Sequence, residues 1–210
     1  MSYLLFDDTS TLADFETYVG RAKQADPDGA IRLMAVGQAV AAWVCVLEGS
    51  GLTGDGTVLG LRVLHLSSPA EFDTVTSLAA CSDRLARRSP EPSFSVPPTT
   101  LTPPWAALTP PRSRWQSAGE VPAAPLREAA ETGIAEVAQG ATAGAGALAV
   151  AELRRRVWSV DLGTHPSIPR GAAFGLHVLG FLPTTVESVT VHQQGRWTRL
   201  STPYGHVLTR

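Results

Sequence analysis

Four histidines in the last third of the chain are the first residues whose type suggests chemistry. His165, His177, His192 and His206 follow one another at separations of 12, 15 and 14 residues, and neutral imidazole is a common metal ligand. None of them forms an H-x-x-x-H or H-E-x-x-H pair, which would place two ligands on one helix face. The pattern favours histidines at the surface or at strand edges, with His177 on a buried helix, and we expect no metal and no cofactor.

A proline-rich stretch at the centre of the chain carries the next candidates. "VPPTTLTPPWAALTPPRSRW", residues 96–115, holds six prolines, two tryptophans and two arginines. Proline restrains both itself and the preceding residue to extended conformations, and tryptophan buries a large apolar area. We therefore interpret the stretch as an ordered strap anchored by its tryptophans, in preference to a free hinge or a ligand for proline-recognition domains. The candidate ligand-binding residues are Trp105, Arg112, Arg114, Trp115 and His206, whose cations suit an anionic ligand.

The segment Gly49-Ser50-Gly51-Leu52-Thr53-Gly54 matches the G-x-G-x-x-G pattern and follows an apolar strand. Dinucleotide binding requires a helix immediately after such a loop, because the helix N-terminus holds the pyrophosphate. Here "DGTVLGLRVLHL" reads as a strand, so the glycines indicate a hairpin connection. The later "GAGALA" at Gly144 precedes a helix but follows no strand, and it is weaker still.

Other reactive residues lack the neighbours that catalysis needs. The chain has no G-x-S-x-G motif, and nothing near Cys45 or Cys81 would lower a thiol pKa. Both cysteines lie in apolar patterns that favour buried thiols. In "ELRRRVW", Glu152 can pair with the arginines that follow it, so a solvated helix face is favoured over an anion clamp. No catalytic residue is assigned, and we favour a protein that is not an enzyme.

Composition places the chain among globular proteins. Of its 210 residues 44% are hydrophobic and 17% charged, with a net charge of −2, and this length can bury a sizeable core without disulfides. Residues 1–95 hold seven basic and twelve acidic groups, a balance of −5, and residues 96–210 hold ten and seven, a balance of +3. The near-neutral chain lacks the basic footprint of nucleic-acid binding. The absence of a signal-peptide pattern and of a long apolar run predicts a cytoplasmic protein with no membrane partner.

Hydrophobic periodicity predicts helix, three strands and helix in the first half. A helix capped by Ser10 or Thr11 ends near "DPDG", and two strands follow, separated near Gly37. "GTVLGLRVLHLSS" is the third strand. Ser68, Pro69 and Glu71 have the pattern of a helix start and capping box.

In the second half, helices are expected at about 124–138 and 146–159, separated by "GATAGAG", and a third in the apolar "PRGAAFGLHVLGFL". A hairpin turning at Gln194-Gly195 and a strand in "GHVLTR" follow. This grouping predicts an α+β fold with antiparallel sheets and helices packed against them, in two α+β halves joined by the proline-rich strap. The expected organisation is residues 1–95, 96–115 and 116–210, forming one cooperative unit.

The motifs "PPW…PPRSRW", "LRRRVW", "LGFL" and "GRWTRLSTPYGHVLTR" resemble a group of uncharacterised conserved hypothetical proteins of actinobacteria of about this length. That resemblance covers most of the chain and implies a bacterial cytoplasmic setting. It implies no activity and no catalytic residue.

Two classes of function stay open at this point. The first is a non-catalytic module that binds a protein partner or itself, favoured by the missing catalytic motifs, the proline-rich stretch and the apolar "GAAFGLHVLGFL", which suggests a homo-oligomer. The second is a small-molecule binding protein or enzyme with a pocket between the halves, where Arg112, Arg114 and His206 would meet an anion. We favour the first.

Overall fold

The computed structural model describes residues 2–51, 53–87, 91–141 and 146–210. The fold is α+β with antiparallel sheets, in two halves, as the sequence predicted. The first unit comprises Met1–Val46 and Leu59–Thr109, and the second comprises Leu47–Val58 and Pro110–Arg210. The chain therefore passes between the units within two long strands and again inside the proline-rich stretch.

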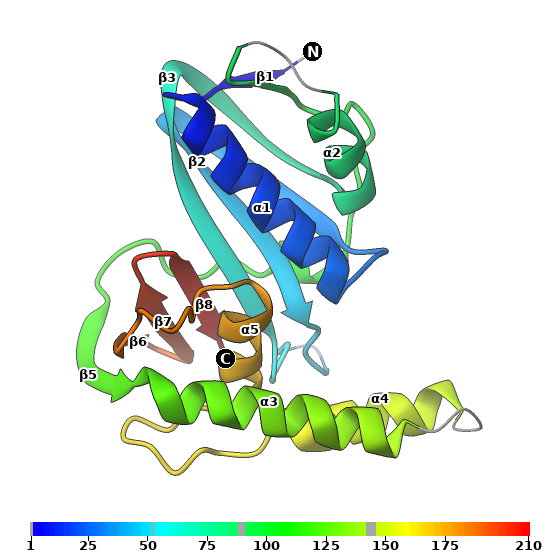
Figure 1. The fold of residues 1–210 in the computed structure, drawn as a ribbon, viewed down its shortest axis with the longest axis vertical. Helices are drawn as coiled ribbons and strands as arrows, with labels where there is room; N and C mark the ends of the chain where they lie inside the picture. Colours follow the sequence, from blue (N-terminus) through cyan, green and yellow to red (C-terminus); the bar gives the residue numbers. More distant parts are fainter. Residues whose placement is uncertain (1, 52, 88–90, 142–145) are drawn as a thin grey trace. The chain divides into compact units, whose positions relative to one another are not determined.

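The first unit is built on two long strands with a helix laid across them (Figure 1). Its elements are β1 (Tyr3–Leu5), α1 (Thr9–Ala25), β2 (Ala30–Leu47), β3 (Val58–Ser77), α2 (Leu78–Leu85), β4 (Ser93–Ser95) and a 3₁₀ turn at Pro104–Ala107. β2 pairs with β3, and β1 pairs with β4. The core centres on Phe15, whose ring lies 5.5 Å from that of Phe6 and 5.2 Å from that of Phe94. Such tilted and edge-on ring pairs are the favoured aromatic geometries.

Helix α1 begins two or three residues earlier than expected, with Asp8 and not Ser10 or Thr11 as its N-cap. The Thr11 backbone N–H donates to Asp8 Oδ1 at 2.7 Å, and the Ser10 hydroxyl donates to the same oxygen. These bonds to the Thr11 backbone and the Ser10 hydroxyl hold the pKa of Asp8 below its ordinary value.

This cap makes part of the stability dependent on pH. Because the folded pKa of Asp8 is depressed, the cap stabilises the fold above the unfolded pKa and is lost as pH falls through the folded pKa. We expect the melting temperature of the wild type to fall more steeply below about pH 4 than that of Asp8→Asn, whose amide oxygen caps without titrating. Thermal melts followed by circular dichroism from neutral pH downward measure this. Identical pH profiles would show that Asp8 is not the titrating cap.

Two expectations for the first half are wrong. The two strands expected around Gly37 form the single strand β2. Gly37 adopts a φ of 59°, which glycine allows, and the strand continues beyond it. Ser68, Pro69 and Glu71 lie within β3, and α2 begins only at Leu78, where the Ser77 hydroxyl accepts from the Ala80 N–H at 3.1 Å. Long-range pairing with β2 outweighs the local capping pattern.

The second unit packs helices against one face of four antiparallel strands, of which the last three form a meander. Its elements are β5 (Gln116–Pro122), α3 (Ala123–Gly140), α4 (Ala147–Trp158), α5 (Arg170–Val178), β6 (Ser188–Gln194), β7 (Trp197–Thr202) and β8 (Gly205–Thr209). The strands are ordered β8-β7-β6-β5. Four residues of the strands' inner face have no exposed surface: Val189, Val191, Leu200 and Val207. Helix α5 contacts β8 and α3.

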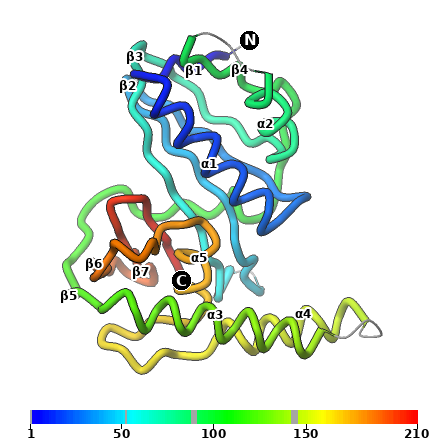
Figure 2. The backbone as a smooth tube through the Cα atoms, viewed as in Figure 1, coloured from blue at the N-terminus to red at the C-terminus, as the bar shows by residue number. Residues whose placement is uncertain are grey.

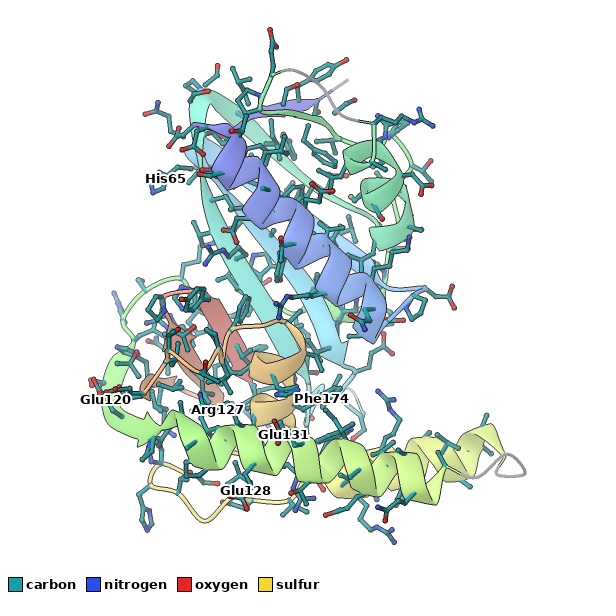
Figure 3. All side chains as sticks on the ribbon, viewed as in Figure 1. His65, Glu120, Arg127, Glu128, Glu131 and Phe174 are labelled. Atoms are coloured by element: carbon teal, nitrogen blue, oxygen red, sulfur yellow. The ribbon has the colours of Figure 1, made fainter. Side chains whose placement is uncertain are left out.

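Helix α5 is buried within its own unit, because Gly171 to Leu176 are all buried. The ring of Phe174, which Figure 3 labels, stacks on that of Trp158, with the ring centres 4.2 Å apart. The apolar "GAAFGLHVLGFL" is therefore core, and the expectation that it drives self-association is wrong. Strand β5 is a further element that the sequence did not predict.

Candidate functional site

The face of the β6–β7–β8 meander opposite Val191, Leu200 and Val207 gathers polar and aromatic side chains. His192 lies opposite Arg199, and Gln194 lies opposite Trp197. On the next strand, Leu208 lies opposite Arg199. Alternate residues of a strand share a face, so Arg210, two residues after Leu208, lies on the same face. We call Trp115, His192, Gln194, Trp197, Arg199 and Arg210 the Trp–Arg face.

Two guanidinium groups of this face stack on indole rings. The Arg199 guanidinium carbon lies 4.7 Å from the centre of the Trp115 ring, and that of Arg210 lies 5.4 Å from the Trp197 ring. Trp115 is held in turn by its Nε1, which donates to the Pro111 carbonyl at 3.0 Å. Cation–π stacking fixes the plane of a guanidinium and leaves its N–H edge free to bind.

The candidate residues chosen from sequence divide between the two units. Trp105 belongs to the first unit and is 7% exposed. The other four belong to the second unit: Arg112, Arg114, Trp115 and His206. Arg112 and Arg114 are exposed, and Arg114 adopts a φ of 63° immediately before Trp115. Trp115 contributes to the Trp–Arg face, and His206, two residues before Leu208, lies on the same face of the sheet.

His206 lies across the β7–β8 turn from a serine. Its Nδ1 is 2.8 Å from the Ser201 hydroxyl, and these two residues are partners in the strand register. A serine within hydrogen-bond distance of a histidine is the least that catalysis by a serine nucleophile and a histidine base requires. The same bond also closes a two-residue turn between paired strands, which is a sufficient structural role for it.

A helical hairpin, formed by α3 and α4, is the second notable surface of this unit. The helices pack closely because Gly133 faces the ring of Trp158 and Gly140 faces Leu153. Figure 2 shows the chain running out along α3 and back along α4. Leu148 of α4 is 88% exposed and Ile134 of α3 is 37% exposed.

Charge is segregated between the two helices of the hairpin. Helix α3 carries exposed Glu128 and Glu131 (Figure 3), and α4 carries exposed Arg154 and Arg156. Within the described parts of the chain, none of these four side chains has an ion pair or a side-chain hydrogen bond. Arg155 is different, because it pairs with Glu152 at 2.6 Å as the sequence predicted.

A groove of about 490 Å³ lies in the first unit, lined by residues of α1, α2, β1 and β4. Its apolar lining includes Leu12, Leu85 and Phe94, and Glu16 and Arg84 lie at its polar part. The Arg84 side chain already donates to the Ser95 hydroxyl at 2.9 Å. This bond gives Arg84 a role within its own fold.

The motifs with cofactor or redox potential have structural roles. The glycine-rich loop joins β2 to β3, as expected of a hairpin connection, with Leu52 and residues 142–145, including Gly144, outside the described residues. Cys81 is buried in α2, and burial raises its pKa to about 12, so its thiolate is suppressed. Among the described residues, no three His, Cys, Asp or Glu side chains gather as they would around a metal ion. Within the same residues, no helix is long and apolar enough to cross a membrane.

Comparison with solved structures defines the fold class. The chain is similar to a putative DNA polymerase III beta subunit from Eubacterium rectale, with a TM-score of 0.58 and 8% identity, over 99% of this chain and 64% of that one. It is also similar to the DNA polymerase III beta chain from Streptococcus pneumoniae, with a TM-score of 0.51 and 13% identity, over 100% of this chain and 64% of that one. The chain thus spans less than two thirds of the length of each. At these identities the likeness concerns the fold.

The chain belongs to the family described as Domain of unknown function (DUF8010), whose model matches residues 1–107. Residues 110–210 match a second family model, Domain of unknown function (DUF8185). The two matches meet inside the proline-rich stretch. No curated protein matches the sequence.

Proposed function

We propose that the chain is a non-catalytic interaction module that associates with a second copy of itself through the α3–α4 hairpin. The observation that carries the proposal is the segregation of unpaired charge on this hairpin, acidic on α3 and basic on α4. A surface of this kind is self-complementary, because a two-fold axis can place α3 of one copy against α4 of the other twice over.

The exposed apolar residues of the hairpin also support a second copy of the chain as its partner. Leu148 projects almost its whole side chain into water, and Ile134 adds a second exposed aliphatic group. Single exposed leucines are common on protein surfaces. Here they lie on the element that also carries the opposite charges, so an interface on the hairpin would bury apolar as well as charged side chains.

The comparisons support an association role in a general way. Both similar structures are named as one subunit or chain of DNA polymerase III, and so as part of an assembly. The resemblance of the sequence motifs to actinobacterial hypothetical proteins supports a bacterial cytoplasmic setting for this module.

Sedimentation velocity over a concentration series tests the proposal. We expect wild-type protein to form a reversible dimer at tens of micromolar, and Arg156→Glu or Glu131→Arg to weaken association by at least about tenfold. Each reversal acts twice in a symmetric dimer, and each exposed pair is worth roughly 0.2–1 kcal/mol before repulsion is added.

Arg21→Glu is the matched control, because Arg21 is also exposed on a helix but lies on α1. It should associate as the wild type does. Wild-type protein that stays monomeric across the series would contradict self-association and leave the hairpin to a different protein. Equal weakening by all three variants would show a general charge effect and would also contradict the proposal.

A further inference from the structure

The two arginines of the Trp–Arg face lack the acidic partner that half-buried cations normally have. In the part of the chain that the structure describes, neither Arg199 nor Arg210 makes an ion pair or a side-chain hydrogen bond. Other half-buried arginines of this protein have oxygen acceptors. Arg32 binds Asp73 at 2.6 Å and Arg170 binds Glu136 at 2.9 Å, whereas Arg84 and Arg127 donate to serine or carbonyl oxygens and have no acidic partner. The stacked arginines therefore depart from the protein's own pattern.

Polar atoms without partners are concentrated on this face. The buried side-chain atoms that find no hydrogen-bond partner in the described structure include His192 Nδ1, Gln194 Oε1, Arg199 Nε and Arg210 Nε. Such groups are rare in native proteins, and each one destabilises the fold unless water, an ion or a ligand satisfies it. Four such atoms on one sheet face indicate a ligand-binding site.

The chemistry of the face selects a negatively charged ligand. Arg199 and Arg210 offer only donors, and His192 donates whenever Nδ1 carries its proton. The Gln194 amide presents a donor after a half-turn about its terminal bond. Burial lowers the pKa of Arg199, so a bound anion would offset an electrostatic cost that the free protein bears.

We propose that the Trp–Arg face binds an oxyanion, a carboxylate or phosphate group, with Arg199 as its main cation and His192, Gln194 and Arg210 around it. The stacked indole of Trp115 holds the Arg199 guanidinium in plane, which suits bidentate recognition of two oxygens. The site differs from the one expected from sequence, since Arg112 and Arg114 are exposed and are not among its donors. It is independent of self-association, because the hairpin and the face share no residue.

Isothermal titration calorimetry with inorganic phosphate and with succinate tests the proposal at constant ionic strength, with sodium chloride as the blank. We expect saturable binding of at least one of the two anions, accompanied by a rise in melting temperature. The anion that binds more tightly distinguishes a phosphate ligand from a carboxylate one.

Three variants locate the site. Arg199→Gln and Arg210→Gln should each lower the affinity by at least about tenfold, since a charge-assisted hydrogen bond is lost. Arg196→Gln is the control, because it removes an exposed charge in the turn between β6 and β7 that pairs with Asp55. It should bind the anion as the wild type does. If Arg199→Gln does not fold, Arg210→Gln decides alone. Failure of both anions to bind the wild type would overturn the proposal, and so would affinities unchanged in Arg199→Gln and Arg210→Gln.

Discussion

Replacing Trp105 by alanine is expected to lower the free energy of unfolding by about 3–5 kcal/mol, the usual cost of truncating a buried aromatic side chain. The indole is 7% exposed. The 3₁₀ turn that carries it is held by Arg32, whose guanidinium donates to the Ala106 carbonyl at 2.9 Å. This loss is a large fraction of the roughly 5–15 kcal/mol that stabilises a typical domain.

Urea denaturation followed by circular dichroism measures the loss from Trp105→Ala. Leu101→Ala is the control within the same stretch, because Leu101 is 37% exposed and should cost only about 1 kcal/mol. A Trp105→Ala variant as stable as the wild type would favour a free hinge over the proposed strap. Rapid proteolysis within residues 96–115 of the native protein would contradict the strap in the same way.

Replacing Gly133 by alanine is expected to destabilise the second unit by about 1–3 kcal/mol, although alanine favours helix. A β-carbon at Gly133 would lie 2.7 Å from Cη2 of the Trp158 ring and closer still to its Cζ3, and that ring is confined by its stack on Phe174. The overpacking cost exceeds the gain of about 0.5–1 kcal/mol in helix propensity.

Gly20→Ala provides the matched comparison on α1, since a β-carbon added at Gly20 would have nothing within 4 Å of it. This variant should gain about 0.5–1 kcal/mol of stability from helix propensity alone. Thermal melts of the two variants should therefore shift in opposite directions. A Gly133→Ala protein that melts above the wild type would mean that α3 does not pack on Trp158 as described.

Elements with strong local signals could be predicted from the sequence. The helices expected at about 124–138 and 146–159 correspond to α3 and α4, and the hairpin at Gly195 joins β6 to β7. The errors occur where distant pairing decides. The Ser68–Glu71 pattern satisfies every local rule for a helix start, yet these residues continue β3, because the preference of a few residues is small beside the pairing of two long strands.

Short strands carry too little local signal to be found. β1 and β4 are three residues each and pair with each other across about ninety residues of sequence. β5 contains Gly119 and a register shift between Ser117 and Gly119, which interrupt the alternation by which a strand is recognised.

The candidate site was predictable only in part. Trp115 stands out by the composition of its stretch, whereas His192 and Arg199 meet only through the register of β6 and β7. A signal was nevertheless present, because "VTVH" before Gly195 and "WTRL" after it each alternate between two kinds of side chain, with His192 on one strand and Trp197 and Arg199 on the other. Reading that alternation as a two-faced hairpin would have placed His192, Trp197 and Arg199 together.

Sedimentation of a mixture of Glu131→Arg and Arg156→Glu tests self-association through the hairpin most directly. Each variant alone places like charges against each other, whereas the mixed pair restores one native and one reversed attraction in every heterodimer. We expect the mixture to associate at least about tenfold more tightly than either variant alone, close to the wild type. A mixture that sediments as the average of its two components would contradict the proposed pairing of α3 with α4.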